Sequence, residues 1–310
     1  MKIGNVHVRN RVFLAPMVDI TTLPYRLLCL KYGAGMVYSE MVVANSLVHN
    51  SKSALDAVKT TKEEHPYGVQ LAGNDPELIL RAAEKTTCDV IDLNFGCPSH
   101  KLLDNNMCSA LLQKPEKIKE IITFLIENLD VPVTAKIRLG YKRRNFMDVA
   151  KTIENAGARA LCVHGRTAVQ GYKSTSDWEA IKEIKKSLSI PVIGNGDVFD
   201  GKSASALLDD VDFVMIGRAA IGDPFVFERI KKYLAKGESM EKPTLEDKYA
   251  CFLEYVQLSK KHKLYDFKLI KRMSLAFAKN VEYSAKLRGV LNICETLEEI
   301  KERFKKFIHS

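Results

Sequence analysis

The sequence lacks a long apolar run, a secretion signal and a paired set of cysteines. No apolar run approaches the roughly 20 residues that cross a bilayer. The first residues, Met1 to Asn5, have no apolar core of the kind found in signal peptides. We therefore expect a cytoplasmic protein that does not enter a membrane.

The seven cysteines are too scattered for a disulfide framework, and none forms a CxxC pair or lies at metal-site spacing from a histidine. This excludes a disulfide-stapled scaffold and a zinc site, and we expect no bound metal. Most of them should be small buried hydrophobic residues. Their positions are Cys29, Cys88, Cys97, Cys108, Cys162, Cys251 and Cys294.

A dinucleotide fingerprint is also missing, because Gly33-Ala34-Gly35 lacks the third glycine and does not follow a predicted strand. The composition is otherwise ordinary, with 46% hydrophobic and 27% charged residues among 310. Such a chain has room for one large barrel with a small appendage, or for two medium domains.

Charge is more informative. The chain carries 47 Lys and Arg against 38 Asp and Glu, a formal net charge of +9. From Glu241 to Ser310 there are 15 basic and 10 acidic residues, so over half of the excess lies in under a quarter of the length. A nucleic-acid partner explains this asymmetry, and so does a solvated lysine-rich helix surface.

Short branched-apolar runs alternate with amphipathic stretches over about 220 residues. Helical spacing is clearest in Ile118–Leu129 and Trp178–Leu188, and a hairpin is predicted from Ile3 to Val8. The pattern predicts an α/β protein, either a (β/α)8 TIM barrel or a doubly wound open sheet. The eight predicted strands are Val12–Ala15, Met36–Ser39, Gly68–Leu71, Val90–Asn94, Val133–Ile137, Ala160–His164, Val192–Gly194 and Phe213–Ile216.

Polar residues at the strand ends favour the barrel. In a barrel these ends converge on one mouth, whereas an open sheet spreads them along a line. The first strand ends in Ala15-Pro16-Met17, where proline turns the chain and leaves Met17 as an adaptable apolar surface. The polar residues are Gln70, Asn94, Lys136, His164, Asn195 and Gly217-Arg218.

The strand–helix theme stops near Leu234. We expect the barrel to occupy residues 1–235, a polar linker residues 236–243, and a small all-helical domain residues 244–310. Thr244, with Asp247 three residues later, predicts a capped helix start.

Two features at the predicted mouth indicate an anionic ligand. Asn195-Gly196-Asp197 and Gly217-Arg218 follow the last two strands, where barrels commonly bind phosphate, although a turn-forming Asn-Gly has a simpler explanation. Lys136 faces inward by strand alternation, and an inward ammonium needs an anionic partner. His164 ends the next strand, where it is either a ligand or a hydrogen-bonded core residue.

A tight loop carries the most reactive side chain. The strand Asp89 to Asn94 runs into Phe95-Gly96-Cys97-Pro98, and glycine and proline end it. A thiol in such a loop is a poor core filler and a good candidate for proton or nucleophile chemistry.

Six segments follow one another over roughly the first 235 residues. They are Leu14-Ala15-Pro16-Met17, Asp92-Leu93-Asn94-Phe95-Gly96-Cys97-Pro98, Lys136-Ile137-Arg138, Val163-His164-Gly165-Arg166-Thr167, Gly194-Asn195-Gly196-Asp197 and Ile216-Gly217-Arg218. In this order and spacing they resemble the tRNA-dihydrouridine synthases. The helical tail resembles that family's RNA-binding domain in kind more than in detail.

The resemblance implies an FMN-dependent barrel that reduces the C5–C6 double bond of selected tRNA uridines, with NADPH (or NADH) as electron donor. Hydride from reduced flavin N5 would reach C6, and Cys97, with an ordinary thiol pKa, would protonate C5. The implied FMN-binding residues are Pro16, Met17, Gln70, Lys136, His164, Asn195, Gly196, Asp197, Gly217 and Arg218. The implied substrate contacts are Asn94, Arg138, Arg166, Lys271, Arg272 and Arg288.

The sequence departs from the family pattern in three places. The loop after Met17 reads Val18-Asp19-Ile20-Thr21-Thr22, and Asp104 to Ser109 replaces a glycine-rich run. In the tail, Glu282 to Arg288 replaces a glycine-proline turn. Asparagine tolerates the left-handed conformation, so we expect the second loop to keep its fold.

Three functions fit these features. A monomeric flavin enzyme acting on tRNA explains both the barrel mouth and the basic tail. An FMN barrel acting on a free pyrimidine or enone needs no such tail. An RNA-binding barrel without chemistry would not need Cys97, Lys136 and His164 together.

Overall fold

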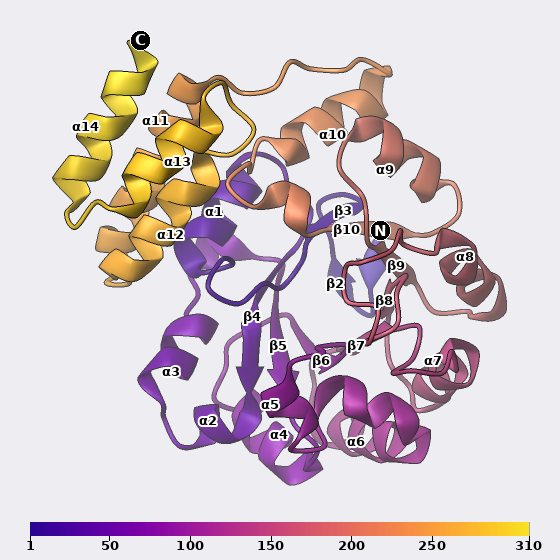
Figure 1. Cartoon of the computed structure of the whole chain (residues 1–310). Coiled ribbons are helices and arrows are strands. Elements are labelled where there is room, and N and C mark those ends of the chain that lie inside the picture. The colour runs from indigo at the N-terminus through magenta and orange to yellow at the C-terminus, as the bar shows by residue number, and fades with distance from the viewer. Residues whose placement is uncertain (310) are drawn as a thin grey trace.

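Eight parallel strands form the central sheet of the computed structural model, which describes residues 1–309 (Figure 1). Their order is β3-β10-β9-β8-β7-β6-β5-β4, and Phe13 of β3 meets Met36, just before β4, through a single bridge. The sheet is therefore a barrel with a seam between β3 and β4, and the predicted (β/α)8 architecture is confirmed. The strands are β3 (Val12–Leu14), β4 (Val37–Val43), β5 (Tyr67–Ala72), β6 (Val90–Phe95), β7 (Val133–Arg138), β8 (Leu161–His164), β9 (Val192–Asn195) and β10 (Phe213–Ile216).

Helices cover the outside of the barrel. Asp75, Asp177 and Asp200 cap three of them by accepting backbone N–H groups, and proline stands in the first turn of α4 and α6. The two predicted amphipathic helices are confirmed as α6 and α8. The helices are α1 (Leu23–Lys31), α2 (Ala44–Val48), α3 (Lys52–Val58), α4 (Pro76–Ala83), α5 (His100–Leu103), α6 (Pro115–Asn128), α7 (Phe146–Asn155), α8 (Trp178–Ser187), α9 (Gly201–Leu208) and α10 (Val226–Lys236), with 3-10 turns at Lys62–Glu64, Cys108–Gln113 and Arg218–Ala220.

The amino-terminal end of the barrel is covered by the predicted hairpin, whose strands are β1 (Lys2–Ile3) and β2 (Val6–His7). Ile3 is fully buried among the inward-facing residues of the barrel strands. The polar strand ends are therefore left at the opposite, carboxyl-terminal end, where barrels place their active sites.

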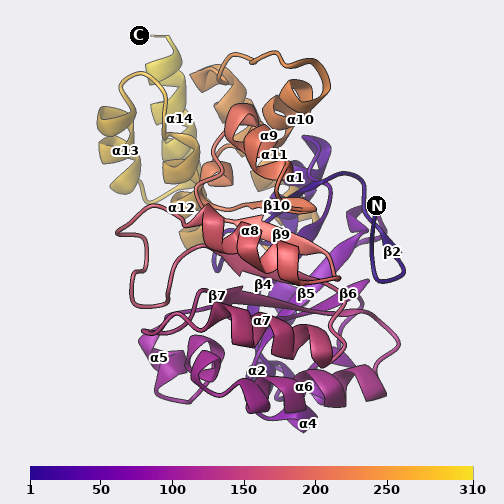
Figure 2. The same ribbon diagram turned by 90° about the vertical axis from the view of Figure 1, so that its right-hand side faces the viewer.

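Four more helices follow α10, and Thr244 and Asp247 form the predicted capping box at the first of them. Figure 2 shows α12 and α13 on the same side of the barrel as α5. The helices are α11 (Leu245–Lys261), α12 (Phe267–Phe277), α13 (Ser284–Asn292) and α14 (Leu297–Ile308).

The core continues from the barrel into these helices. Tyr25 of α1 is fully buried, and its ring meets Tyr255 of α11 and Phe277 of α12 edge to face. Gly222, with φ +71°, lies so close to the carbonyl of Ala276 that a Cβ would overlap it. The barrel and the carboxyl-terminal helices are thus packed backbone to backbone at this contact.

Candidate active site

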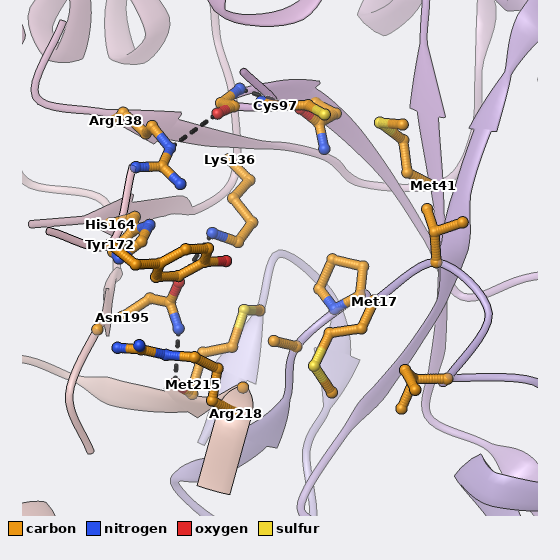
Figure 3. Close-up of a pocket in the computed structure, with 18 of the residues that line it drawn as sticks. Met17, Met41, Cys97, Lys136, Arg138, His164, Tyr172, Asn195, Met215 and Arg218 are labelled. Atoms are coloured by element: carbon orange, nitrogen blue, oxygen red, sulfur yellow. Dashed lines mark hydrogen bonds between the residues drawn. The ribbon is translucent and has the colours of Figure 1, made fainter. Parts of the chain in front are cut away.

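The polar strand ends converge on one pocket of ≈ 390 Å³ at the carboxyl-terminal end of the barrel (Figure 3). This volume lies in the range typical of cofactor sites. The residues named from the sequence that line it are Pro16, Met17, Gln70, Asn94, Cys97, Lys136, Arg138, His164, Asn195, Gly196, Asp197, Gly217 and Arg218.

The pocket has two unlike walls. The loop after β3 supplies Met17 and Val18, and strand β4 supplies Met41, to an apolar wall. Strands β7 to β10 and the loops after them supply a cationic wall of Lys136, Arg138 and Arg218, with the His164 ring between them. Figure 3 shows Met17 and Met41 on one side and Lys136, Arg138 and His164 on the other.

Lys136 is held by an amide. Its Nζ donates to Asn195 Oδ1 at 2.9 Å, and Asn195 Nδ2 donates to the Met215 carbonyl at 2.8 Å. Asn195 is therefore oriented with its oxygen toward the ammonium, and the remaining Lys136 protons are free to meet a ligand.

Asp197 orients two arginines. Its Oδ2 accepts from Arg166 at 2.6 Å and its Oδ1 from Arg218 at 2.7 Å. Partial burial opposes its charge, but the Ser176 N–H and the guanidinium groups together lower its pKa. A carboxylate repels phosphate, so Asp197 positions Arg218 and does not itself contact an anion.

Beside these residues the structure has a cradle suited to a phosphate. Gly196 adopts φ +117°, and a Cβ there would overlap Ser176 Oγ and approach His164 Cδ2 to 2.8 Å. The Ser176 hydroxyl is buried behind Gly196 without a hydrogen-bond partner, and Ser176 is not among the residues that line the pocket. Arg218, on the rim, adds a charged donor.

His164 is neutral in this setting. Burial lowers its pKa to about 2, with the charges of Lys136, Arg138, Arg166 and Arg218 acting in the same direction. Its Nε2 lies 3.2 Å from an Arg166 nitrogen, which can only donate, so Nε2 accepts and Nδ1 carries the proton.

Arg166 lies outside the pocket and does not support the predicted substrate contact. It is only 2% exposed, and its guanidinium donates to the Ser174 carbonyl and to Asp197. Its place two residues beyond the strand end suggested the mouth, but the ion pair with Asp197 draws it under the loop.

Tyr172, in the loop after β8, lines the pocket and was missed in the sequence. Its ring stacks on the Arg218 guanidinium at 4.5 Å and lies 5.8 Å from that of Arg138, while the residue is 59% exposed. A lone aromatic residue in a long loop gives no periodic signal. Only its closeness in sequence to His164 and Arg166 pointed to this end of the barrel.

Cys97 lies in the loop predicted for it, where the two walls meet. Asn94 Oδ1 accepts the Gly96 N–H at 3.0 Å and the Cys97 N–H at 2.8 Å, and Arg138 Nε donates to the Gly96 carbonyl at 2.9 Å. The Cys97 carbonyl accepts from the Ser109 hydroxyl at 2.8 Å. The loop is thus fixed on both sides.

The expectation of an ordinary thiol pKa for Cys97 is wrong. A hydrogen bond from the Cys108 thiol lowers the pKa of Cys97 to about 6, against the effect of burial, and the Ser99 N–H and the charges of Arg138 and Lys136 act with it. The pKa of Cys108, fully buried beside Cys97 and Met41, is raised. At neutral pH the pair therefore keeps one proton, on Cys108, whose thiol lies 3.9 Å from Met41 Sδ.

The amides of Gln70 and Asn94 are engaged within the protein. Gln70 is fully buried, with Nε2 donating to Asp92 and Oε1 accepting from Asn94. Gln70 uses one of its two N–H protons on Asp92 and keeps the other, so its predicted contact to a ligand ring stays a prediction. Asn94 keeps one N–H proton for a ligand.

The predicted substrate contacts in the tail lie away from the pocket, Lys271 and Arg272 on α12 and Arg288 on α13. Arg272 forms an ion pair with Asp19, which stands in the loop after β3 and has φ +59°. One tail residue therefore contacts the loop that carries Met17.

The loop that replaces the glycine-rich run keeps a left-handed backbone, as expected. Asn106 has φ +53° and Cys108 has φ +54°. Asparagine adopts this conformation at little cost, and the buried hydrogen-bonded thiol holds Cys108 in it.

Solved structures match the barrel. The chain aligns with 6-hydroxypseudooxynicotine amine oxidase from Pseudomonas geniculata at a TM-score of 0.59 and 15% identity, covering 83% of this chain and 51% of the other. It aligns with the old yellow enzyme homologue from Zymomonas mobilis at a TM-score of 0.55 and 14% identity, covering 80% and 94%. At such low identity these likenesses concern the fold alone.

Curated sequences match more closely. tRNA-dihydrouridine synthase B of Pasteurella multocida is 38% identical over 265 residues, covering 83% of this chain and 80% of that protein. The Shewanella oneidensis protein of the same name is 36% identical over 309 residues, covering 96% and 95%. The Escherichia coli one is 40% identical over 245 residues, covering 77% and 76%. The dihydrouridine synthase (Dus) family model matches residues 13–310, and the chain therefore belongs to the dihydrouridine synthase family.

Proposed function

We propose that this protein reduces the C5–C6 double bond of specific uridines in tRNA to give 5,6-dihydrouridine, with FMN as cofactor and NADPH as electron donor. The observation that carries the proposal is the Cys97 loop, fixed at the junction of an apolar and a cationic wall, in a chain of this family. The names of the curated relatives support tRNA as substrate.

The donor set fits FMN. Arg218 and the backbone at Gly196 and Gly217 would hold the phosphate, and Lys136 would hold the edge of the ring where negative charge develops. Met17 would supply an apolar surface for the ring face. When bound and reduced, FMN supplies the hydride for C6 of uracil.

Cys97 would deliver the proton to C5. The uracil C5–C6 bond is conjugated with the C4 carbonyl, so addition at C6 leaves negative charge toward C5 and O4. The protonated form of Cys97 would transfer its proton to C5, breaking the S–H bond, and the thiolate left on Cys97 would be stabilised by the charges of Arg138 and Lys136. Arg138, fixed by the Gly96, Thr167 and Gly171 carbonyls, can meet a uracil carbonyl without reorganising.

The carboxyl-terminal helices would bind the tRNA. A stacked uridine must leave its helix before it can enter the pocket, and backbone contacts hold the RNA while it does so. Lys271, Arg272 and Arg288 are the proposed contacts. We expect a monomer acting in the cytoplasm. Within residues 1–309 no helix has both the length and the apolar character to cross a membrane.

The test is to map dihydrouridine in unmodified tRNA after incubation with the FMN-loaded protein and NADPH, with NADH in a parallel reaction. We expect dihydrouridine at one or a few positions. Flavin-loaded protein that leaves all uridines unreduced would overturn the proposal. Reduction of free uridine that is unaffected by excess tRNA would instead identify a small-molecule reductase, and tRNA binding by a protein unable to take up FMN would identify an RNA-binding protein.

A further inference from the structure

A chain of buried polar side chains runs beneath the Cys97 loop. It begins at Asp92 on β6, passes through Gln70 on β5 and Asn94 on β6, and ends at the N–H groups of Gly96 and Cys97. We propose that Asp92 is a positioning residue, which sets the direction of this chain and thereby fixes the Cys97 loop.

Sheet register places these groups together. Gln70 stands opposite Asp92, and Asp92 stands opposite Thr134, in the paired strands β5, β6 and β7. Residues 92 and 94 share a face by strand alternation. The chain therefore links three strands inside the barrel, where water does not compete for its hydrogen bonds.

Each contact in the chain is short. Thr134 Oγ1 donates to Asp92 Oδ1 at 2.7 Å, and Gln70 Nε2 donates to Asp92 Oδ2 at 2.6 Å. Asn94 Nδ2 donates to Gln70 Oε1 at 2.8 Å. Asp92 is 2% exposed and Asn94 9%. No link depends on solvent-exposed side chains, so each one is strong enough to orient the next.

The direction of the chain follows from its ends. A carboxylate only accepts, so Gln70 must turn its NH2 toward Asp92 and its oxygen toward Asn94. Asn94 must then turn its NH2 toward Gln70 and its oxygen toward the loop. The loop N–H groups only donate, so both ends require the same orientation of the two amides. Reversing either amide would set donor against donor or acceptor against acceptor in the interior.

The consequence concerns Cys97, whose sulfur meets Cys108, Arg138 and Lys136 only while the loop is in place. The catalytic importance of the Cys97 loop rests on the proposed function. The experiment described below does not rest on it, because it measures the reactivity of the Cys97 thiol in the full-length protein without flavin or tRNA.

The sharpest test exchanges the two end groups. In Asn94→Asp the new carboxylate still accepts the loop N–H groups but forces Gln70 to turn round, so that Gln70 presents its oxygen to Asp92. Adding Asp92→Asn supplies an NH2 for that oxygen, and the reversed chain is again complete. If Asp92 is a structural residue with no link to the loop, its substitution cannot repair Asn94→Asp.

The measurement is the pH–rate profile of Cys97 alkylation by iodoacetamide, followed by peptide mass spectrometry. We expect Asn94→Asp to move the midpoint up by about 1 pH unit or more, toward the value of a free thiol. Asp92→Asn/Asn94→Asp should recover at least half of that shift. Asp92→Asn alone should raise the midpoint, but by less than Asn94→Asp does, because the new amide can still accept from Gln70 in one of its two orientations and the loop N–H groups still hold Asn94.

The matched control repeats the same three variants in a protein that also carries Gln70→Met, which removes the amide in the middle of the hydrogen-bond series. The carboxylate introduced at position 94 is present with Gln70 and with Met at position 70, so its direct effect on the Cys97 charge cancels in the comparison. With Gln70→Met, Asp92→Asn should not bring the midpoint of Asn94→Asp back down. The proposal would be overturned if the double variant had the same midpoint as Asn94→Asp. It would also be overturned if Asp92→Asn still lowered the midpoint when Gln70→Met is present. If Asn94→Asp does not fold, the measurement is instead whether the double variant Asp92→Asn/Asn94→Asp gives folded protein with a cooperative melting transition. Recovery of folded protein in the double variant then supports the proposal, and a double variant that also fails to fold refutes it.

Discussion

The two walls of the pocket are built on different principles. On the cationic wall, Lys136 is held by Asn195, Arg138 by three carbonyls and Arg218 by Asp197. On the apolar wall, Met17 lies on the loop after β3 and Met41 on β4, next to the barrel seam, and both side chains are unbranched. The cationic wall is preorganised and can specify charge and position, whereas the apolar wall can adapt to a flat ring.

The largest effect should come from the thiol where the walls meet. We expect Cys97→Ala to lower the rate of dihydrouridine formation by about 10²–10³-fold, as is usual when a proton donor is removed. FMN affinity, followed by quenching of flavin fluorescence, should be unchanged. Full activity of Cys97→Ala at neutral pH would exclude this cysteine as the donor.

The cationic wall should matter next, and through affinity. Arg218→Ala removes a charged hydrogen-bond donor from the proposed phosphate cradle, worth about 1.5–3 kcal/mol, so the Kd of FMN should rise about 10–100-fold. Arg218→Lys keeps the charge without the planar fork and should lie between. Riboflavin, which has no phosphate, should bind wild type and Arg218→Ala equally. A similar loss for both ligands would place the phosphate elsewhere.

The pKa of Cys97 is lowered both by Cys108 and by the charges of the cationic wall, and a substitution at Cys108 separates the two effects. Removing the hydrogen-bond donor in Cys108→Ala should raise the pKa of Cys97 from about 6, by about 1 pH unit in the alkylation profile. Cys108→Ser keeps a donor at the same place and should change the profile less. An unchanged midpoint in Cys108→Ala would assign the lowered pKa to the Ser99 N–H and the charges of Arg138 and Lys136.

The apolar wall should show a smaller, size-dependent effect. Met17→Ala removes apolar surface from the proposed ring contact and should weaken FMN binding about fivefold, or about 1 kcal/mol. Met17→Leu conserves the volume and should bind FMN almost as the wild type does. Isothermal titration measures the FMN affinity of both variants. An equal loss of affinity in Met17→Ala and Met17→Leu would mean that the apolar wall does not adapt to the ring.

The smallest effect concerns acid stability. The pKa of His164 is about 2 when folded and about 6.5 when unfolded, so below pH 6.5 only the unfolded chain gains this proton. The unfolding free energy should therefore decrease as the pH falls below 6.5, by up to about 1.4 kcal/mol per unit from this group. His164→Gln should show a shallower dependence in urea unfolding between about pH 6.5 and about pH 5. A slope equal to that of the wild type would show that the folded protein can protonate His164.

Strand alternation and strand ends made much of this predictable. Lys136 and Asn195 were placed at the mouth by periodicity, and both line the pocket. What periodicity cannot give is pairing between distant segments. Asp197 binds Arg166 and hides it, and Cys108 changes the pKa of Cys97, through contacts that depend on how two loops fold against each other. Asp92 looked like an ordinary strand residue because its partners come from two other strands.

The seam between β3 and β4 gives the barrel a mechanical asymmetry. Phe13 and Met36 form a single bridge there, whereas every other neighbouring pair of strands is joined over several residues. The loop carrying Asp19 emerges beside this seam and is tied to Arg272 on α12. A load placed on the carboxyl-terminal helices would therefore reach the barrel at two points, the loop beside the seam through this ion pair and the segment after β10 through the close contact of Gly222 with Ala276.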